Sequence, residues 1–267
     1  MSIEINNLSF GYKNNEVLHN ISFEIKENCL ISILGPNGIG KTTLFKCMLG
    51  LLSGYKGNIY YNDKNIKSFT SKALANTVAY IPQSHYPTYS YSVLEMVLMG
   101  TTSHITKISG PGKSELEKVE EALETIGITH LKYRGYSNIS GGERQLVLIA
   151  RALAQKAKIL IMDEPTANLD YGNQIKVLTI VKQLVQAGYT IIQSTHQPDH
   201  AFLYADRVLA LLGGHIVKEG TPKNMITSDL IKTLYGIDVD ITSLYDDYIR
   251  VCIPKSIIYE HQDKLLF

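Results

Sequence analysis

One short segment constrains the fold of this chain more than any other part of its sequence. Its residues are Gly35, Pro36, Asn37, Gly38, Ile39, Gly40, Lys41 and Thr42, which match the pattern G-x-x-x-x-G-K-[ST] at every fixed position. The apolar run 29–34 before it predicts a buried strand, and residues 43–49 after it predict the start of a helix. In that context glycines turn backbone N–H groups inward around phosphates, and the helix N-terminus adds its positive end. The segment therefore predicts a binding site for a nucleoside triphosphate.

The side chains of this segment have separate predicted roles. Lys41 can reach the β- and γ-phosphates, and the Thr42 hydroxyl can ligate Mg²⁺. Thr43 completes the predicted nucleotide-binding set at the start of the helix. A glycine-rich surface turn is the alternative interpretation, but it explains neither the preceding strand nor the lysine and threonine together.

Composition and charge exclude several classes of protein. The 267 residues suffice for one large domain with a subdomain, and 45% hydrophobic with 19% charged residues is typical of a globular chain. A formal net charge of +1 argues against binding nucleic acid through a broad basic surface. The cysteines, Cys29, Cys47 and Cys252, lie too far apart for metal-ligand spacing and predict reduced thiols. Since no apolar run approaches ~20 residues and no signal-peptide pattern is present, we expect a cytosolic chain that contacts a membrane only through a partner.

The predicted strands form two groups. Alternating apolar residues predict short strands near the N-terminus, separated by turns at 10–12 and 13–15, and a further strand at 57–62. The stretches 159–162 and 190–193 predict fully buried parallel strands, with a helix near 174–187 between them. Shorter strands are predicted at 78–83, 207–212 and 215–219.

A helical pattern interrupts the predicted strands from about residue 90 to residue 154. Residues 92–100 contain helix formers and end in glycine. Ser114 to Glu117 fits a capping box, and it opens a predicted amphipathic helix that Gly127 closes. The predicted buried face of that helix consists of Leu116, Val119, Leu123 and Ile126. The sequence thus predicts a helical insertion within an α/β nucleotide-binding core.

A second motif, Asp163-Glu164, directly follows the predicted strand 159–162. In P-loop ATPases an aspartate at the end of such a strand helps to hold Mg²⁺ beside the phosphate loop. The glutamate after it is placed to polarise water for attack on the γ-phosphate. An apolar strand that ends in two acids is weak evidence alone, but it is strong evidence in a chain that also carries a phosphate loop.

A third motif lies upstream of these acids, where Ser140, Gly141 and Gly142 precede the helical run 146–153. Alone, this is an N-cap with flexible residues that suits any anion. Together with the other motifs it resembles the signature motif of ABC-type ATPases, and the resemblance covers nearly the whole chain in the family's order. Four further positions carry the resemblance. Tyr12 matches the adenine-stacking aromatic and Gln83 the Q-loop glutamine. Asp170 matches the D-loop aspartate and His196 the switch histidine.

The resemblance implies a role for each of these residues. ATP and Mg²⁺ are bound between two copies in a head-to-tail homodimer, so that Lys41 and Thr42 of one copy face Ser140 and Gly142 of the other. Glu164 is the implied general base, His196 holds the γ-phosphate and the attacking water, and Gln83 contacts Mg²⁺ and water.

Three of these residues also have ordinary structural interpretations. From the residues alone, Tyr12 fits a tyrosine packed in a turn, and His196 fits a core histidine with its polar atoms satisfied. Gln83 fits a plain loop residue. The sequence also departs from the usual family pattern at Ile39, Glu143 and Asn168, and none of these changes removes a catalytic group.

The resemblance also implies the fold, the domains and the partners. We expect an α/β P-loop NTPase core with an N-terminal antiparallel β subdomain and an inserted helical subdomain at about 87–154, all within an ATP-binding domain of residues 1–240. Residues 241–267 form a short C-terminal extension. The stretches 89–100 and 234–239 resemble the ATPases of metal-chelate importers, which take up iron-siderophore, haem, cobalamin or molybdate.

The implied function is ATP hydrolysis that powers an ABC membrane importer from the cytoplasmic face of the membrane. The implied partners are the permease subunits and, through them, a substrate-binding protein. No nucleic acid is expected as a partner. The alternatives are a soluble ABC ATPase of repair or translation, or a transporter ATPase for another cargo. Only a short stretch separates Gln83 from Ser140, whereas repair and chromosome types carry a very long coiled coil there.

Overall fold

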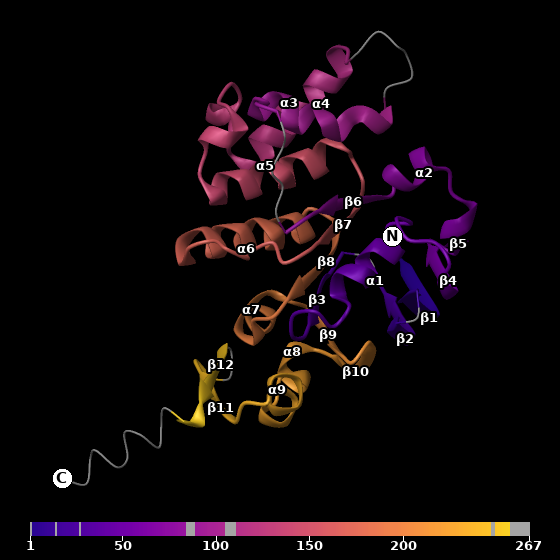
Figure 1. Ribbon diagram of the computed structural model, residues 1–267. Helices are drawn as coiled ribbons and strands as arrows, with labels where there is room; N and C mark the ends of the chain where they lie inside the picture. The colour runs from indigo at the N-terminus through magenta and orange to yellow at the C-terminus, as the bar shows by residue number, and fades with distance from the viewer. Residues whose placement is uncertain are drawn as a thin grey trace, which may run out of the picture.

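The computed structural model describes residues 2–13, 15–26, 28–83, 89–104, 111–246 and 249–256, except for the side chains of residues 103 and 104. Two sheets meet at the centre of the molecule, and helices cover them (Figure 1). The predicted fold class, an α/β core with an antiparallel β subdomain and helices, is confirmed. Residues 87–88 and 105–110 of the predicted helical insertion, and 247–248 and 257–267 of the predicted extension, lie outside the described residues.

The N-terminal sheet is antiparallel and has the strand order β2-β1-β4-β5. Its strands are β1 (Ile3–Tyr12), β2 (Asn15–Ile25), β4 (Lys56–Tyr61) and β5 (Lys64–Asn65). The predicted turn at 10–12 is wrong, because these residues continue β1 and pair with β2 as far as Tyr12 opposite Asn15. The chain turns at Lys13 instead, whose φ of 53° is left-handed.

The larger sheet has the strand order β10-β9-β3-β8-β7-β6. Its strands are β3 (Leu30–Leu34), β6 (Val78–Ile81), β7 (Ile159–Met162), β8 (Thr190–Thr195), β9 (Arg207–Leu212) and β10 (His215–Gly220). All neighbours are parallel except β9 and β10. Every residue of β3, β7 and β8 is buried, as predicted for parallel strands covered on both faces.

The helices around the larger sheet connect its strands. They are α1 (Lys41–Met48), α2 (Ser71–Ala75), α6 (Tyr171–Gln186) and α7 (Pro198–Tyr204), with a 3₁₀ turn, η1, at Ile66–Ser68. Because the strands are parallel, the connections that leave β3, β6, β7 and β8 all begin at the same edge of the sheet.

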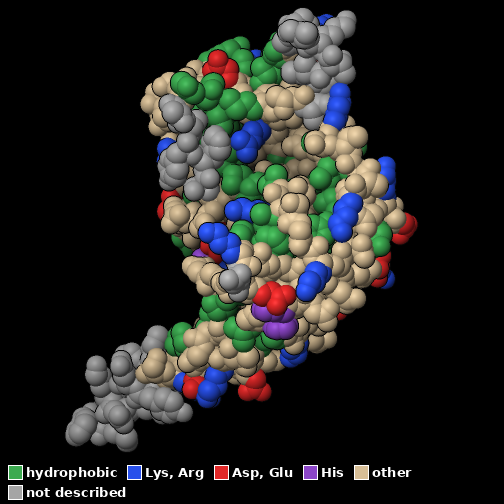
Figure 2. All heavy atoms as spheres, turned by 45° about the vertical axis from the view of Figure 1, so that its right-hand side comes forward, with side chains coloured by type: hydrophobic (Ala, Val, Ile, Leu, Met, Phe, Trp, Pro, Cys, Tyr) green, Lys and Arg blue, Asp and Glu red, His purple; other side chains and the backbone are tan. Residues whose placement is uncertain are grey.

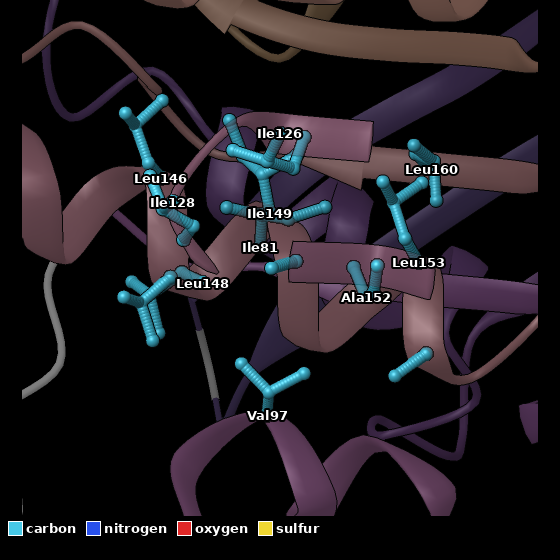
Figure 3. Close-up of a cluster of buried hydrophobic side chains, with 14 of the residues drawn as sticks. Ile81, Val97, Ile126, Ile128, Leu146, Leu148, Ile149, Ala152, Leu153 and Leu160 are labelled. Atoms are coloured by element: carbon cyan, nitrogen blue, oxygen red, sulfur yellow. The ribbon is translucent and has the colours of Figure 1, made fainter. Parts of the chain in front are cut away.

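A group of helices forms a separate layer at the top of Figure 1. It contains α3 (Val93–Leu98), α4 (Lys113–Ile126) and α5 (Gly141–Ala154), with 3₁₀ turns η2 (Met99–His104), η3 (Thr129–Leu131) and η4 (Tyr136–Asn138). Figure 3 shows how α5 joins this layer to the sheet: Leu146, Ile149 and Leu153 share one buried cluster with Ile81 of β6 and Leu160 of β7.

Two details of α4 differ from the sequence prediction. The helix begins at Lys113, and Glu115 Oε2 accepts a hydrogen bond from the Gly112 N–H (3.0 Å), so Ser114 lies inside the first turn and is not the cap. Leu116 is 42% exposed, because it lies at the margin of the apolar stripe. Val119, Leu123 and Ile126 are buried, and Gly127 ends the helix in a left-handed conformation, as predicted.

The last part of the described chain adds two short helices and a hairpin. These elements are α8 (Pro222–Met225), α9 (Ser228–Tyr235), β11 (Val239–Leu244) and β12 (Ile249–Pro254). β11 and β12 form an isolated two-stranded sheet that the sequence did not predict, and β12 lies beside α7 (Figure 1). Among the residues described, no helix has the length and apolar character needed to span a bilayer.

Candidate nucleotide-binding site

The carboxyl edge of the parallel sheet brings four of the predicted motifs together. The phosphate loop follows β3, Gln83 follows β6, Asp163 and Glu164 follow β7, and His196 follows β8. Ligands of open α/β sheets bind at this edge. A pocket of about 520 Å³ opens there. Its lining consists of Tyr12, Val17, Asn37, Gly38, Gly40, Lys41, Thr42, Thr43, Gln83, Asp163 and Glu164.

The phosphate loop holds its lysine in a buried position. Gly40, with a φ of 106°, stands at the N-cap of α1, a conformation that side-chain-bearing residues avoid. The next residue, Lys41, is only 5% exposed, and its ammonium donates hydrogen bonds to the carbonyls of Gly35 (2.8 Å) and Pro36 (2.9 Å). The same Nζ lies 3.2 Å from Glu164 Oε1. A buried cation thus stands at the start of a helix, next to the general-base candidate.

Oxygen atoms converge on Asp163. The Thr42 hydroxyl donates to Asp163 Oδ2 (2.6 Å), and the Ser194 hydroxyl donates to Asp163 Oδ1 (2.7 Å). The Tyr80 hydroxyl lies 3.4 Å from Oδ2; burial, the charge of Asp163 and this hydrogen bond raise the pKa of Tyr80 to about 12, so it stays a donor. A hydroxyl and a carboxylate this close are the hard oxygen ligands that Mg²⁺ prefers. The residues therefore fit the metal that the phosphate loop implies.

Glu164 occupies a strained and polar position. Its φ of 45° is left-handed, which is rare for a residue with a side chain, and its N–H donates to Ser194 Oγ (2.8 Å). Glu164 Oε2 accepts a long hydrogen bond from Gln83 Nε2 (3.4 Å) and lies 3.4 Å from His196 Nδ1. The carboxylate of Glu164 therefore faces Gln83 and His196.

Tyr12 forms one wall of the pocket at the end of β1. It is 45% exposed, and its ring meets that of Phe10 edge-to-face at 5.0 Å. One face of the tyrosine ring is therefore accessible beside the phosphate loop, as stacking on a base requires.

The signature motif and Asp170 do not line this pocket. Ser140 caps α5: its Oγ accepts from the Glu143 N–H (3.2 Å), and Glu143 Oε2 accepts from the Ser140 N–H (2.8 Å). Asp170 caps α6 and accepts from Asn173 N (2.9 Å) and Nδ2 (2.7 Å). A Cβ on Gly142 would lie 2.3 Å from Asn173 Cγ, so a larger residue there would displace the Asn173 side chain that bonds Asp170.

Sequence reasoning missed three residues of this site. Val17 lines the pocket from β2, Tyr80 reaches Asp163 from β6, and Ser194 bonds both acids from β8. Ser194 is fully buried in β8, and a buried hydroxyl needs a partner. That polar residue shortly before His196 was the available signal.

A parallel sheet with a phosphate loop after one strand and two acids after another defines a P-loop nucleotide-binding protein. Comparisons with known proteins make the class more specific. The family model described as ABC transporter matches residues 18–167. An uncharacterized ABC transporter ATP-binding protein of Haemophilus influenzae is 40% identical over 235 residues, which is 88% of this chain and 89% of the relative.

Two further similarities are more specific. The ferric enterobactin transport ATP-binding protein of Escherichia coli is 34% identical over 231 residues, 86% of this chain and 85% of that one. A solved chain from an inward-facing transporter described as metal-chelate type has a TM-score of 0.85 at 30% identity and covers 96% of this chain and 98% of its own. The chain belongs to the ABC transporter family, as an ATP-binding subunit with ATPase activity.

Proposed function

We propose that this ATPase powers the import of an iron-siderophore or a related metal chelate through membrane permease subunits. The proposed ATP hydrolysis rests on one observation: at one edge of the sheet, Lys41 contacts Glu164 and Thr42 contacts Asp163. The cargo class rests on similarity: one relative is a ferric enterobactin transport protein, and the solved transporter is of metal-chelate type. A chain that works with permease subunits on a cytoplasmic substrate, ATP, acts at the cytoplasmic face of the membrane.

Thr42, Asp163 and Gln83 would hold Mg²⁺ with hydroxyl, carboxylate and amide oxygens. When bound, the ion neutralises charge on the phosphate oxygens of ATP. Ser194 and Tyr80 donate to Asp163 and keep its carboxylate oriented toward Thr42.

Glu164 acts as the general base in this proposal. Its carboxylate pairs with Lys41 at 3.2 Å, and a bound triphosphate offers Lys41 a stronger anionic partner. The carboxylate then becomes free to accept a proton from the attacking water. His196 and Gln83, each 3.4 Å from Glu164 Oε2, hold the water and the γ-phosphate in line.

The site is completed by a second copy of the chain. Ser140, Gly141, Gly142 and Asp170 present two helix N-termini away from the copy's own pocket. A head-to-tail homodimer would bring the α5 N-terminus of one copy to the γ-phosphate bound by the other, where its dipole and N–H groups stabilise negative charge.

A second hollow is the proposed contact for the permease. It has a volume of about 470 Å³ and lies between α1–α2 and the η2–α5 part of the helical layer. Figure 2 shows apolar side chains gathered at the surface on the face that carries α2. Leu51 is 64% exposed there, and Leu74 and Met99 also line the hollow. Tyr80 connects its wall to Asp163, so a helix seated in the hollow would contact the ATP site through one residue.

The test is a tagged pull-down from gently solubilised native membranes, with the partners identified by mass spectrometry. We expect a permease with many membrane helices and its substrate-binding protein, and the binding protein's ligand would give the cargo. Leu51→Glu should reduce permease recovery while ATP hydrolysis by the isolated chain is unchanged. Recovery of only ribosomal or DNA-bound proteins would contradict the transport function and favour a soluble ABC ATPase.

A further inference from the structure

Arg151 is the charged side chain in the lining of the hollow between α1–α2 and the η2–α5 part of the helical layer. The other described residues of that lining are apolar or uncharged, among them Leu51, Leu74 and Met99. Arg151 is half-buried near the end of α5, and within the described part of the chain its guanidinium has no hydrogen bond or ion pair. A guanidinium carries five N–H donors, so the hollow offers a set of donors to whatever fills it.

The wall around Arg151 is held in place by packing and by hydrogen bonds. A Cβ on Gly100 would collide with the Arg151 carbonyl oxygen and would lie 3.3 Å from Arg151 Cγ, so η2 packs directly against the stem of this side chain. Just beyond α5, Gln155 Nε2 donates to the carbonyls of Val78 (3.0 Å) and Ala75. These contacts fix α5 against η2, α2 and β6. A partner therefore meets a preformed surface, which lowers the entropic cost of binding.

The charge of Arg151 restricts what can cover the hollow. Burial lowers the pKa of Arg151, because the surrounding protein already removes water from the guanidinium. Arginine nevertheless keeps its proton in proteins, so an apolar segment over the hollow would bury an unpaired charge. A carboxylate in that segment would instead form charge-assisted hydrogen bonds with the guanidinium. The stretches 84–88 and 105–110, which follow β6 and η2 and lie outside the described residues, contain no aspartate or glutamate.

We propose that Arg151 binds the carboxylate of an aspartate or glutamate on the permease helix that docks in this hollow. This inference rests on the proposed function, which assigns the hollow to the permease, and it adds the chemistry of the partner. Leu51, Leu74 and Met99 would contact the apolar face of that helix, while its carboxylate accepts hydrogen bonds from the guanidinium. Figure 2 shows Lys and Arg side chains close to the apolar ones on the face that carries α2, which suits an acidic partner.

Arg151→Met tests this proposal, because methionine keeps an unbranched apolar stem and removes the charge. The permease recovered by the wild-type chain would be purified in detergent and titrated with each variant. We expect the Kd for Arg151→Met to rise at least about tenfold, since the permease carboxylate is then buried without its partner. The kcat for ATP hydrolysis by the isolated chain should be unchanged. The Tm should stay the same or rise, because the free chain loses only an unpaired, half-buried charge.

Lys72→Met is the matched control. Lys72 is an exposed basic residue on α2, beside the hollow in sequence but outside its lining, so its variant should bind the permease with the wild-type Kd. An Arg151→Met chain that binds the permease as tightly as the wild type would overturn the proposal. A weaker Kd that comes with a lower Tm would also overturn it, because Arg151 would then support the fold of the wall.

Charge reversal provides a second, independent test. Arg151→Glu should weaken binding further than Arg151→Met does, and one aspartate-to-arginine or glutamate-to-arginine change on the cytoplasmic side of the permease should restore it. If no acidic position of the permease gives this rescue, the proposal is wrong. The two levels remain separable: a wild-type chain that recovers no permease contradicts the proposed function itself. Recovery by the wild type together with equal binding by Arg151→Met contradicts only the role of Arg151.

Discussion

The two halves of the proposed ATP site are built differently. The phosphate loop and the residues after β6, β7 and β8 meet within one chain, and their side chains contact one another around Asp163 and Glu164. Among the described residues, in contrast, Ser140 and Asp170 bond only to their own helix starts, and they line no part of that pocket. From this difference we expect that a single copy can bind ATP, whereas hydrolysis needs residues of two copies. In the proposed homodimer, one copy would supply the phosphate cradle and the other would supply the signature motif for catalysis.

The largest effect should come from Glu164→Gln. The amide keeps the size of the side chain and its contacts with Gln83 and His196, but it cannot accept a proton from water. We expect hydrolysis to fall by at least about 100-fold while ATP still binds. Phosphate release and equilibrium binding of labelled ATP are the two measurements. Turnover within tenfold of the wild type would show that the half built within one chain does not contain the base.

Lys41→Ala tests whether a single copy holds the triphosphate by itself. Removal of the buried ammonium should raise the Kd for ATP by at least about tenfold, as expected for a lost charge-assisted hydrogen bond. Titration calorimetry at concentrations where the chain is monomeric measures this directly. Lys46→Ala, on the same helix but outside the pocket, is the matched control. Equal affinity in wild type and Lys41→Ala would contradict the phosphate-loop assignment.

Tyr12→Ala should have a smaller effect on the same half. Loss of a stacking ring costs about 1–3 kcal/mol per base, so we expect the Kd for ATP to rise about tenfold. Tyr12→Phe should bind as the wild type does, because the ring alone provides the stacking face. If both variants bind ATP normally, Tyr12 only packs against Phe10.

Glu143→Gln should have the smallest effect, and it tests how the signature half is held. Hydrogen bonds from the Ser140 backbone and hydroxyl lower the pKa of Glu143. A carboxyl whose pKa is lowered by folding stabilises the folded state at pH values above its ordinary pKa of 4.5. That stabilisation is lost as the pH falls through the pKa of the folded state. The Tm of the variant should therefore be slightly lower at neutral pH, and the difference should vanish in acid. A difference that does not change with pH would show that the charge has no part in the cap.

The sequence predicted the half built within one chain better than it predicted the C-terminal region. The phosphate loop, the two acids and His196 are each adjacent to a strand in the chain, and parallel strands bring their ends together. Ser194 and Tyr80 were missed because the sequence predicts that each lies in a strand but does not show which side chain its hydroxyl bonds. The β11–β12 hairpin was missed because most of β11 is exposed and β12 is only half-buried, and because α7, which β12 contacts, lies in a distant part of the chain.

The prediction for the α4 start failed for a related reason. Two cap patterns overlap there, one that begins at Gly112 and one at Ser114, and local sequence does not decide between them. The signature motif was recognised by resemblance, yet its proposed function depends on a second chain. No pattern within one sequence can place the phosphate of one copy against Ser140 of another.

The most direct test combines Glu164→Gln with Ser140→Asp. Aspartate caps a helix as well as serine does, so α5 should remain intact, while its charge would repel the γ-phosphate held by a second copy. With ATP and Mg²⁺, analytical ultracentrifugation should show Glu164→Gln shift from 29.8 kDa toward twice that mass. The double variant should remain at the lower mass and bind ATP with unchanged affinity. If the double variant dimerises equally well, or loses ATP binding as a monomer, the division of the site between two copies is wrong.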